Sequence, residues 1–122
     1  MKKKKLYVFG NRYLEFDSLG TKIAESFSKE ISISYVNAPE TLLYSKDKEI
    51  TIIDVVRGIR KPVLIEGASR IRSRKIMSLH DFDLGFVLRL MHELGSDKKI
   101  KIIGVPQHGN AAEIAKEVRP WI

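Results

Sequence analysis

The chain has 122 residues, a length typical of one compact domain, and we expect a single domain over residues 1–122. Hydrophobic residues make up 43% and charged residues 30% of the sequence, which excludes wholesale disorder. The sequence contains no cysteine, which excludes a disulfide framework, a thiolate zinc site and a cysteine nucleophile.

The formal net charge is +7, and much of the excess lies in residues 2–5 and 70–75. Net charge bears on association and solubility rather than on fold, and solvated charged faces account for most such runs. The apolar run after the first lysines, residues 6–9, is too short for a signal peptide, and no stretch is long enough to span a membrane. We therefore expect a soluble cytoplasmic protein with no membrane partner.

The first half of the chain predicts two strands and two helices. Residues 6–9 are apolar and end at a Gly-Asn turn, and residues 31–36 alternate apolar and polar side chains, as strands do. Between them, Asp17 or Ser18 can cap a helix whose apolar face carries Leu19, Ile23 and Phe27. A short helix over residues 40–44 is expected after Pro39.

The second half predicts three more strands and two helices. Residues 49–53 form a β-branched strand that ends on Asp54. The link to the next strand, residues 63–65, is too short for a crossover helix, so that strand should be antiparallel or at an edge. A helix over residues 83–94 and a strand over residues 101–105 follow. Asn110 and Glu113 form a capping box that opens a last helix, with Ile114 and Val118 facing inward.

This order predicts an α/β fold: a three-layer sandwich with a mostly parallel twisted sheet of about five strands, one antiparallel edge strand and helices on both faces. Ligands bind at the carboxyl ends of the strands in such sheets. Asp17, Asp54 and His80 can all reach that edge, and we expect them to converge there at one solvent-accessible rim. Two carboxylates and an imidazole suit a borderline metal such as nickel, zinc or iron.

Each of these residues also has a structural explanation. Asp17 can cap the first helix, Asp54 can accept backbone hydrogen bonds in a turn, and His80 can take part in the cap of the helix that follows it. No G-x-S-x-G elbow, no P-loop and no G-x-G-x-x-G motif is present, so serine hydrolases and phosphate-binding folds lack their usual signatures.

Four segments, taken in order, are similar to one family. The segment Gly10-Asn11-x-x-Leu14-x-x-Asp17-x-x-Gly20 resembles the opening motif of the [NiFe]-hydrogenase maturation endopeptidases. Ile52-Ile53-Asp54 resembles their strand that ends in a ligand aspartate, and Ser78-Leu79-His80 with Leu84-Gly85 resembles their histidine segment. The strand that runs into Pro106 and Gln107 is similar to their last strand.

The resemblance implies an endopeptidase that removes a C-terminal extension from the precursor of a [NiFe]-hydrogenase large subunit after nickel insertion. It implies that Asp17, Asp54 and His80 are both the metal-contacting and the catalytic residues. The nickel would be supplied by the substrate and held only weakly by the free protein. The implied partner is the precursor, not nucleic acid.

The sequence also departs from the family pattern. Phe16-Asp17 replaces the usual pair of acids, which makes Glu15 a lesser candidate ligand, and Val55-Val56-Arg57-Gly58 replaces the usual small residue after the second aspartate. Two alternatives remain open from the residues. One is a non-enzymatic module that binds RNA or an acidic protein through residues 70–75, and the other is a metal-independent hydrolase or small-molecule binder.

Overall fold

The structure is a computed structural model that describes residues 4–9, 18–36, 47–56, 58–66 and 99–122. The helices expected over residues 40–44 and 83–94 lie outside these ranges.

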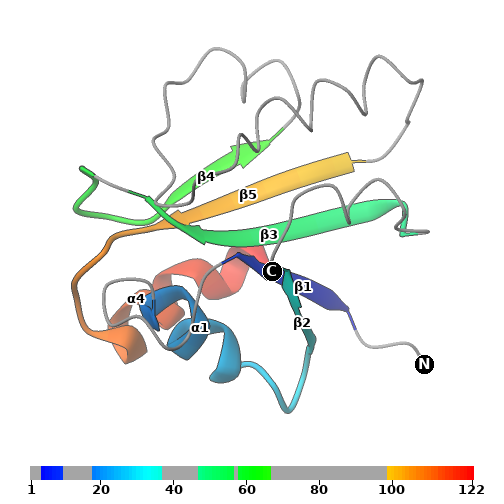
Figure 1. Cartoon of the computed structure of the whole chain (residues 1–122), viewed down its shortest axis with the longest axis horizontal. Coiled ribbons are helices and arrows are strands. Elements are labelled where there is room, and N and C mark those ends of the chain that lie inside the picture. Colours follow the sequence, from blue (N-terminus) through cyan, green and yellow to red (C-terminus); the bar gives the residue numbers. More distant parts are fainter. Residues whose placement is uncertain (1–3, 10–17, 37–46, 57, 67–98) are drawn as a thin grey trace.

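The described strands form one five-stranded sheet in the order β2-β1-β3-β5-β4 (Figure 1). All neighbouring strands are parallel except β4, which pairs antiparallel with β5 at one edge. The predicted α/β class and the antiparallel edge strand are therefore confirmed. The strands are β1 (Lys5–Phe9), β2 (Ser32–Val36), β3 (Glu49–Val55), β4 (Val63–Glu66) and β5 (Lys99–Val105).

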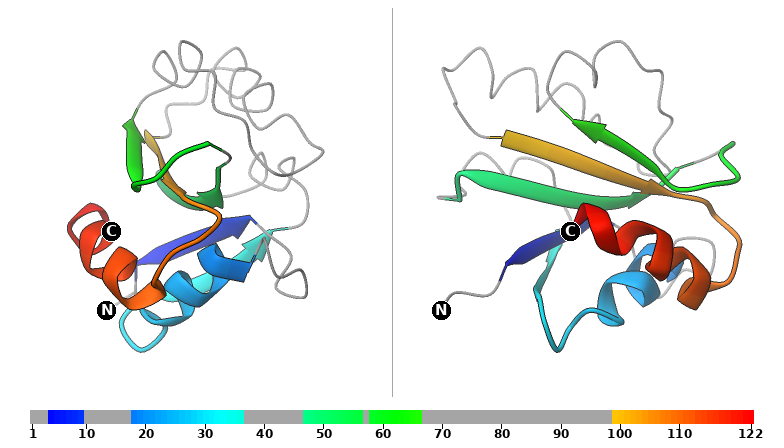
Figure 2. Two further views of the ribbon diagram at one scale, coloured as in Figure 1. Left: turned by 90° about the vertical axis from the view of Figure 1, so that its left-hand side faces the viewer. Right: turned by 180° about the vertical axis from the view of Figure 1, so that it is seen from behind.

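The two described α-helices, α1 (Ser18–Glu25) and α4 (Ala111–Val118), pack side by side on one face of the sheet (Figures 1 and 2). A short 3-10 helix, η3 (Arg119–Trp121), continues α4. The helix expected over residues 83–94 falls outside the described ranges, so the helices predicted on the opposite face stay a prediction.

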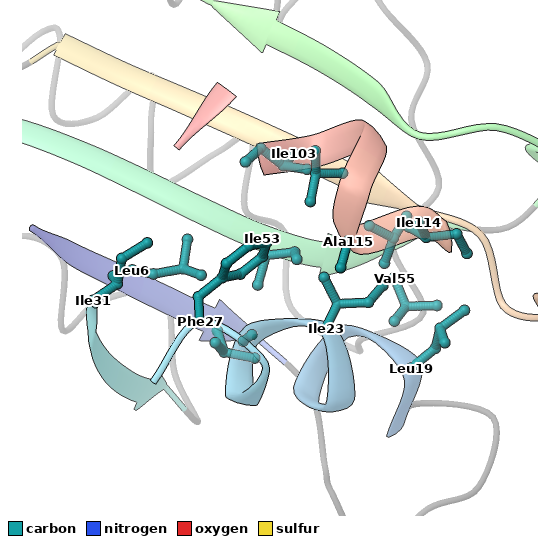
Figure 3. Packing of buried hydrophobic residues seen from close by; sticks show 14 residues of the cluster. Leu6, Leu19, Ile23, Phe27, Ile31, Ile53, Val55, Ile103, Ile114 and Ala115 are labelled. Carbon is teal, nitrogen blue, oxygen red and sulfur yellow. The ribbon is translucent and has the colours of Figure 1, made fainter. Parts of the chain in front are cut away.

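The core between this face and the helices is built from the predicted apolar positions. Leu19, Ile23 and Phe27 of the α1 segment are buried against Ile53 and other strand residues (Figure 3). Ile114 and Val118 of α4 are buried in the same cluster, as expected from their spacing. Burying one such aliphatic side chain contributes roughly 1.5–3 kcal/mol, so this cluster is a principal source of stability.

The opposite face of the sheet is also apolar and buried. Side chains alternate along each strand, so the neighbours of the core residues point to this second face. It carries the buried residues Tyr7 of β1, Ile50 and Ile52 of β3, Ile65 of β4 and Ile102 of β5. Burial on both faces explains why β3 and β5 carry β-branched residues at positions that point to either face.

The predicted cap of the last helix is present. Asn110 has an extended backbone, and its side-chain oxygen Oδ1 accepts a hydrogen bond from the backbone N–H of Glu113 at 3.0 Å. This bond satisfies one of the backbone donors that a helix leaves open in its first turn.

Within the described ranges, none of the helices has the length and apolar character that crossing a membrane requires.

Replacing Asn110 by Ala should lower the free energy of unfolding by about 1 kcal/mol, because the N–H of Glu113 loses its acceptor. Asn110→Asp is the matched control, since aspartate caps about as well as asparagine. Urea denaturation of the three proteins measures the difference. An Ala variant as stable as the wild type would contradict the capping role.

Candidate functional site

The candidate site lies at the carboxyl ends of β1 and β3. Between these two neighbouring strands, the order in which the chain adds strands to the sheet switches from one side of β1 to the other. After β1 the chain passes through α1 to β2 on one side of β1, whereas β3 pairs with β1 on the other side. Parallel pairing from Leu6 with Thr51 to Val8 with Ile53 aligns the two strand ends. Open α/β sheets bind ligands outside the strand ends at such a reversal.

Asp54 is the predicted site residue that the structure describes. It is the next-to-last residue of β3, which continues to Val55, and it pairs with Gly104 of β5. Its neighbours Ile53 and Val55 belong to the helix-covered core, so Asp54 faces the opposite side of the sheet. We expected it at a solvent-accessible rim, but its exposed fraction is 2%.

Asp54 is the one charged side chain that is buried among the described residues. Its strand neighbour on the same face is the buried Ile52, and the facing position on β5 is a glycine. A Cβ atom at Gly104 would lie 3.0 Å from Cγ2 of Val56 and 3.0 Å from Cγ2 of Val63. The strand position paired with Asp54 is therefore closely packed by apolar side chains.

Gly20 brings the start of α1 to the same strand ends. A Cβ atom at Gly20 would lie 3.3 Å from Cγ2 of Val55 and 3.8 Å from Cγ2 of Val105. The helix begins at Ser18, so Asp17 directly precedes in sequence a helix start that contacts the end of β3. This close approach gives the last glycine of the family-like opening motif a packing role.

Asp17, His80 and the lesser candidate Glu15 lie outside the described residues, and so do residues 70–75. Convergence of the three predicted ligands therefore stays a prediction. In the ranges that the structure covers, no group of three histidine, aspartate or glutamate side chains could hold a metal ion.

No role was assigned from the sequence to four other residues of this region. Thr21 on α1 is buried, and its hydroxyl oxygen Oγ1 has no hydrogen-bond partner among the described residues. Arg60, Lys61 and His108 are exposed on loops at the carboxyl edge of the sheet. No sequence motif identifies these positions. They come to one region because of the order of the strands in the sheet, which the spacing of residues along the chain does not reveal.

No protein-family model matches the chain, and a comparison with curated proteins finds no significant match.

Gly20→Leu should destabilise the protein by about 1–3 kcal/mol, because a large side chain must displace Val55 or move α1 off the sheet. Gly20→Ala should remain within about 1 kcal/mol of the wild type, because alanine's higher helix propensity offsets a contact tight by only a few tenths of an ångström. Thermal or urea unfolding compares the two variants. Equal stability of both would show that α1 does not approach β3 closely.

Proposed function

We propose that the chain is an endopeptidase that removes a C-terminal extension from a [NiFe]-hydrogenase large-subunit precursor after nickel insertion. Asp17, Asp54 and His80 recognise the precursor's nickel in this proposal. The observation that supports it is the place of Asp54 at the carboxyl end of the central strand, beside the point where the strand order reverses.

Asp54 is the one acidic residue within a buried apolar stretch of its strand. Its neighbours from Ile52 to Val55 are buried isoleucine and valine. Removing a charge from water costs several kcal/mol unless it gains strong partners. Residues that break the local packing rule in this way occur mainly at functional sites, which supports a role for Asp54 in binding or chemistry.

The chemistry of the donors fits a nickel-bearing substrate. Precursor thiolates would hold the metal, and a protease that adds carboxylate oxygen and imidazole nitrogen would recognise it without competing for it. The burial of Asp54 strengthens its attraction to a cation, because little water screens a buried charge. Rigid pairing of β3 with β1 and β5 holds the carboxylate in place before the substrate arrives.

The reaction is hydrolysis of one peptide bond. Water adds to the scissile carbonyl carbon, the C–N bond breaks, and the leaving amine takes up a proton. A metal ion beside the carbonyl can stabilise the developing negative charge on oxygen. A carboxylate beside the attacking water can accept its proton, a role open to both Asp17 and Asp54.

Nickel in the substrate should be required for trimming. We expect the purified protein to shorten a nickel-loaded large-subunit precursor and to leave the nickel-free precursor intact, because the metal supplies the contact with the three ligands. Mass spectrometry of the precursor after incubation measures the cut. Trimming of both forms at the same rate would exclude nickel recognition.

Asp54→Asn should lower the trimming rate by about two orders of magnitude or more, because an amide neither binds a cation nor accepts a proton as a carboxylate does. Asp17→Asn and His80→Gln should act similarly. Glu66→Gln is the matched control, since Glu66 is an exposed acid at the end of β4, at the opposite edge of the sheet.

Circular dichroism must show that each variant remains folded, which matters most for the buried Asp54. A folded Asp54→Asn variant that trims as fast as the wild type would refute the proposed role of this residue.

A further inference from the structure

Two loops meet at the carboxyl edge of the sheet. One joins β3 to β4 and the other joins β5 to α4. Because β5 lies between β3 and β4, the first loop must cross the end of β5, where the second loop begins. Cδ1 of Ile59 lies 3.8 Å from the position of a Cβ at Gly104, which places the crossing beside the last residues of β5. The green and orange loops share one end of the molecule in Figures 1 and 2.

Both loops are held in place. Gly58 adopts a φ of +80°, which favours glycine, and Ile59 anchors the first loop beside β5. In the second loop Pro106 is buried and Gly109 has a φ of +151°. A Cβ at Gly109 would lie 2.8 Å from Cδ1 of Ile114, so the loop packs directly on α4. A surface held in this way loses little conformational entropy when a partner binds.

The exposed side chains of these loops include two cations and an imidazole: Arg60, Lys61 and His108. We call these three residues the basic rim. Neither loop contains an acidic residue among positions 58–62 and 106–110. Within the part of the chain that the structure describes, none of the three side chains forms an ion pair. The charges of Arg60 and Lys61 are therefore available to a partner.

We infer that the basic rim binds an acidic peptide segment. Building on the proposed function, this segment is the part of the precursor next to the cleaved bond. The described residues favour a peptide over RNA, because single-stranded RNA binding uses exposed aromatic side chains on which bases stack. The exposed large apolar side chain in the described ranges is Tyr35 on β2, and β1, β3 and β5 separate β2 from the β4 edge.

The spacing between strands predicts how far from the cleaved bond the acidic residues of the substrate should lie. Asp54 pairs with Gly104, and Gly104 pairs with Val63, which follows the first loop. These three positions span two strand spacings, about 10 Å. An extended peptide covers that distance in about three residues. Arg60 and Lys61 precede Val63 in the loop, so we expect carboxylates about three or more residues from the scissile bond.

Direct binding tests the basic rim without nickel or cleavage. The probe is a fluorescein-labelled peptide of alternating Glu and Gly, and its Gln–Gly counterpart is the neutral reference. We expect the wild type to bind the Glu peptide more tightly, with an affinity that falls as salt rises. R60E/K61E should weaken that binding by about tenfold or more, and His108→Gln should weaken it less.

K48E/K99E is the matched control, because it makes the same change of charge at exposed lysines of the amino edge. Retained binding by this control supports the rim. Equal losses in both double variants, or equal binding of the neutral peptide, would overturn the inference. Tighter binding of a single-stranded RNA that R60E/K61E abolishes would also overturn it in favour of a nucleic-acid surface.

The kinetics of precursor cleavage distinguish this inference from the proposed function. With a nickel-loaded precursor that carries acids near the cut, R60E/K61E should raise KM with kcat unchanged, because the rim binds substrate and does not touch the reacting atoms. An unchanged KM would overturn the rim as the precursor's docking surface. If no precursor is trimmed but the Glu peptide still depends on the rim, the proposed function fails and the peptide-binding surface stands.

Discussion

Burial of β3 on both of its faces is the constraint on which the rest of the described structure depends. Ile53 and Val55 join the core beneath α1 and α4, while Ile50 and Ile52 lie buried on the other side. Each such side chain contributes roughly 1.5–3 kcal/mol when it leaves water. Parallel pairing with β1 and β5 then brings the three strand ends to one edge. Any residue at the end of β3 is therefore fixed in position and shielded from solvent.

Asp54 occupies that position and is shielded from water. This shielding strengthens every interaction that the carboxylate makes with a cation, because little water screens it. Gly104 removes a side chain from the facing position, and Val56 and Val63 approach it from both sides.

The sequence predicted all five strands and the two described helices, because apolar periodicity and Asn110 report local structure. It placed the strand ends less well: β3 extends to Val55 and β5 begins at Lys99, since these residues gain partners on the neighbouring strand. It also missed the burial of Asp54, because a strand-end acid looks the same whether or not other segments cover it. Gly20 belonged to a motif, yet its contact with Val55 depends on how α1 crosses the sheet.

Several basic side chains are paired within the fold, whereas those of the basic rim form no ion pair among the residues that the structure describes. Lys5 lies 3.9 Å from Asp47, Lys101 donates to the Trp121 carbonyl, and Arg119 binds both oxygens of Glu30. These cations serve the fold. The basic rim instead shares the carboxyl edge with the buried carboxylate of Asp54. A carboxylate alone would repel an acidic peptide, whereas both signs of charge at one edge fit a substrate that presents a metal cation together with carboxylates.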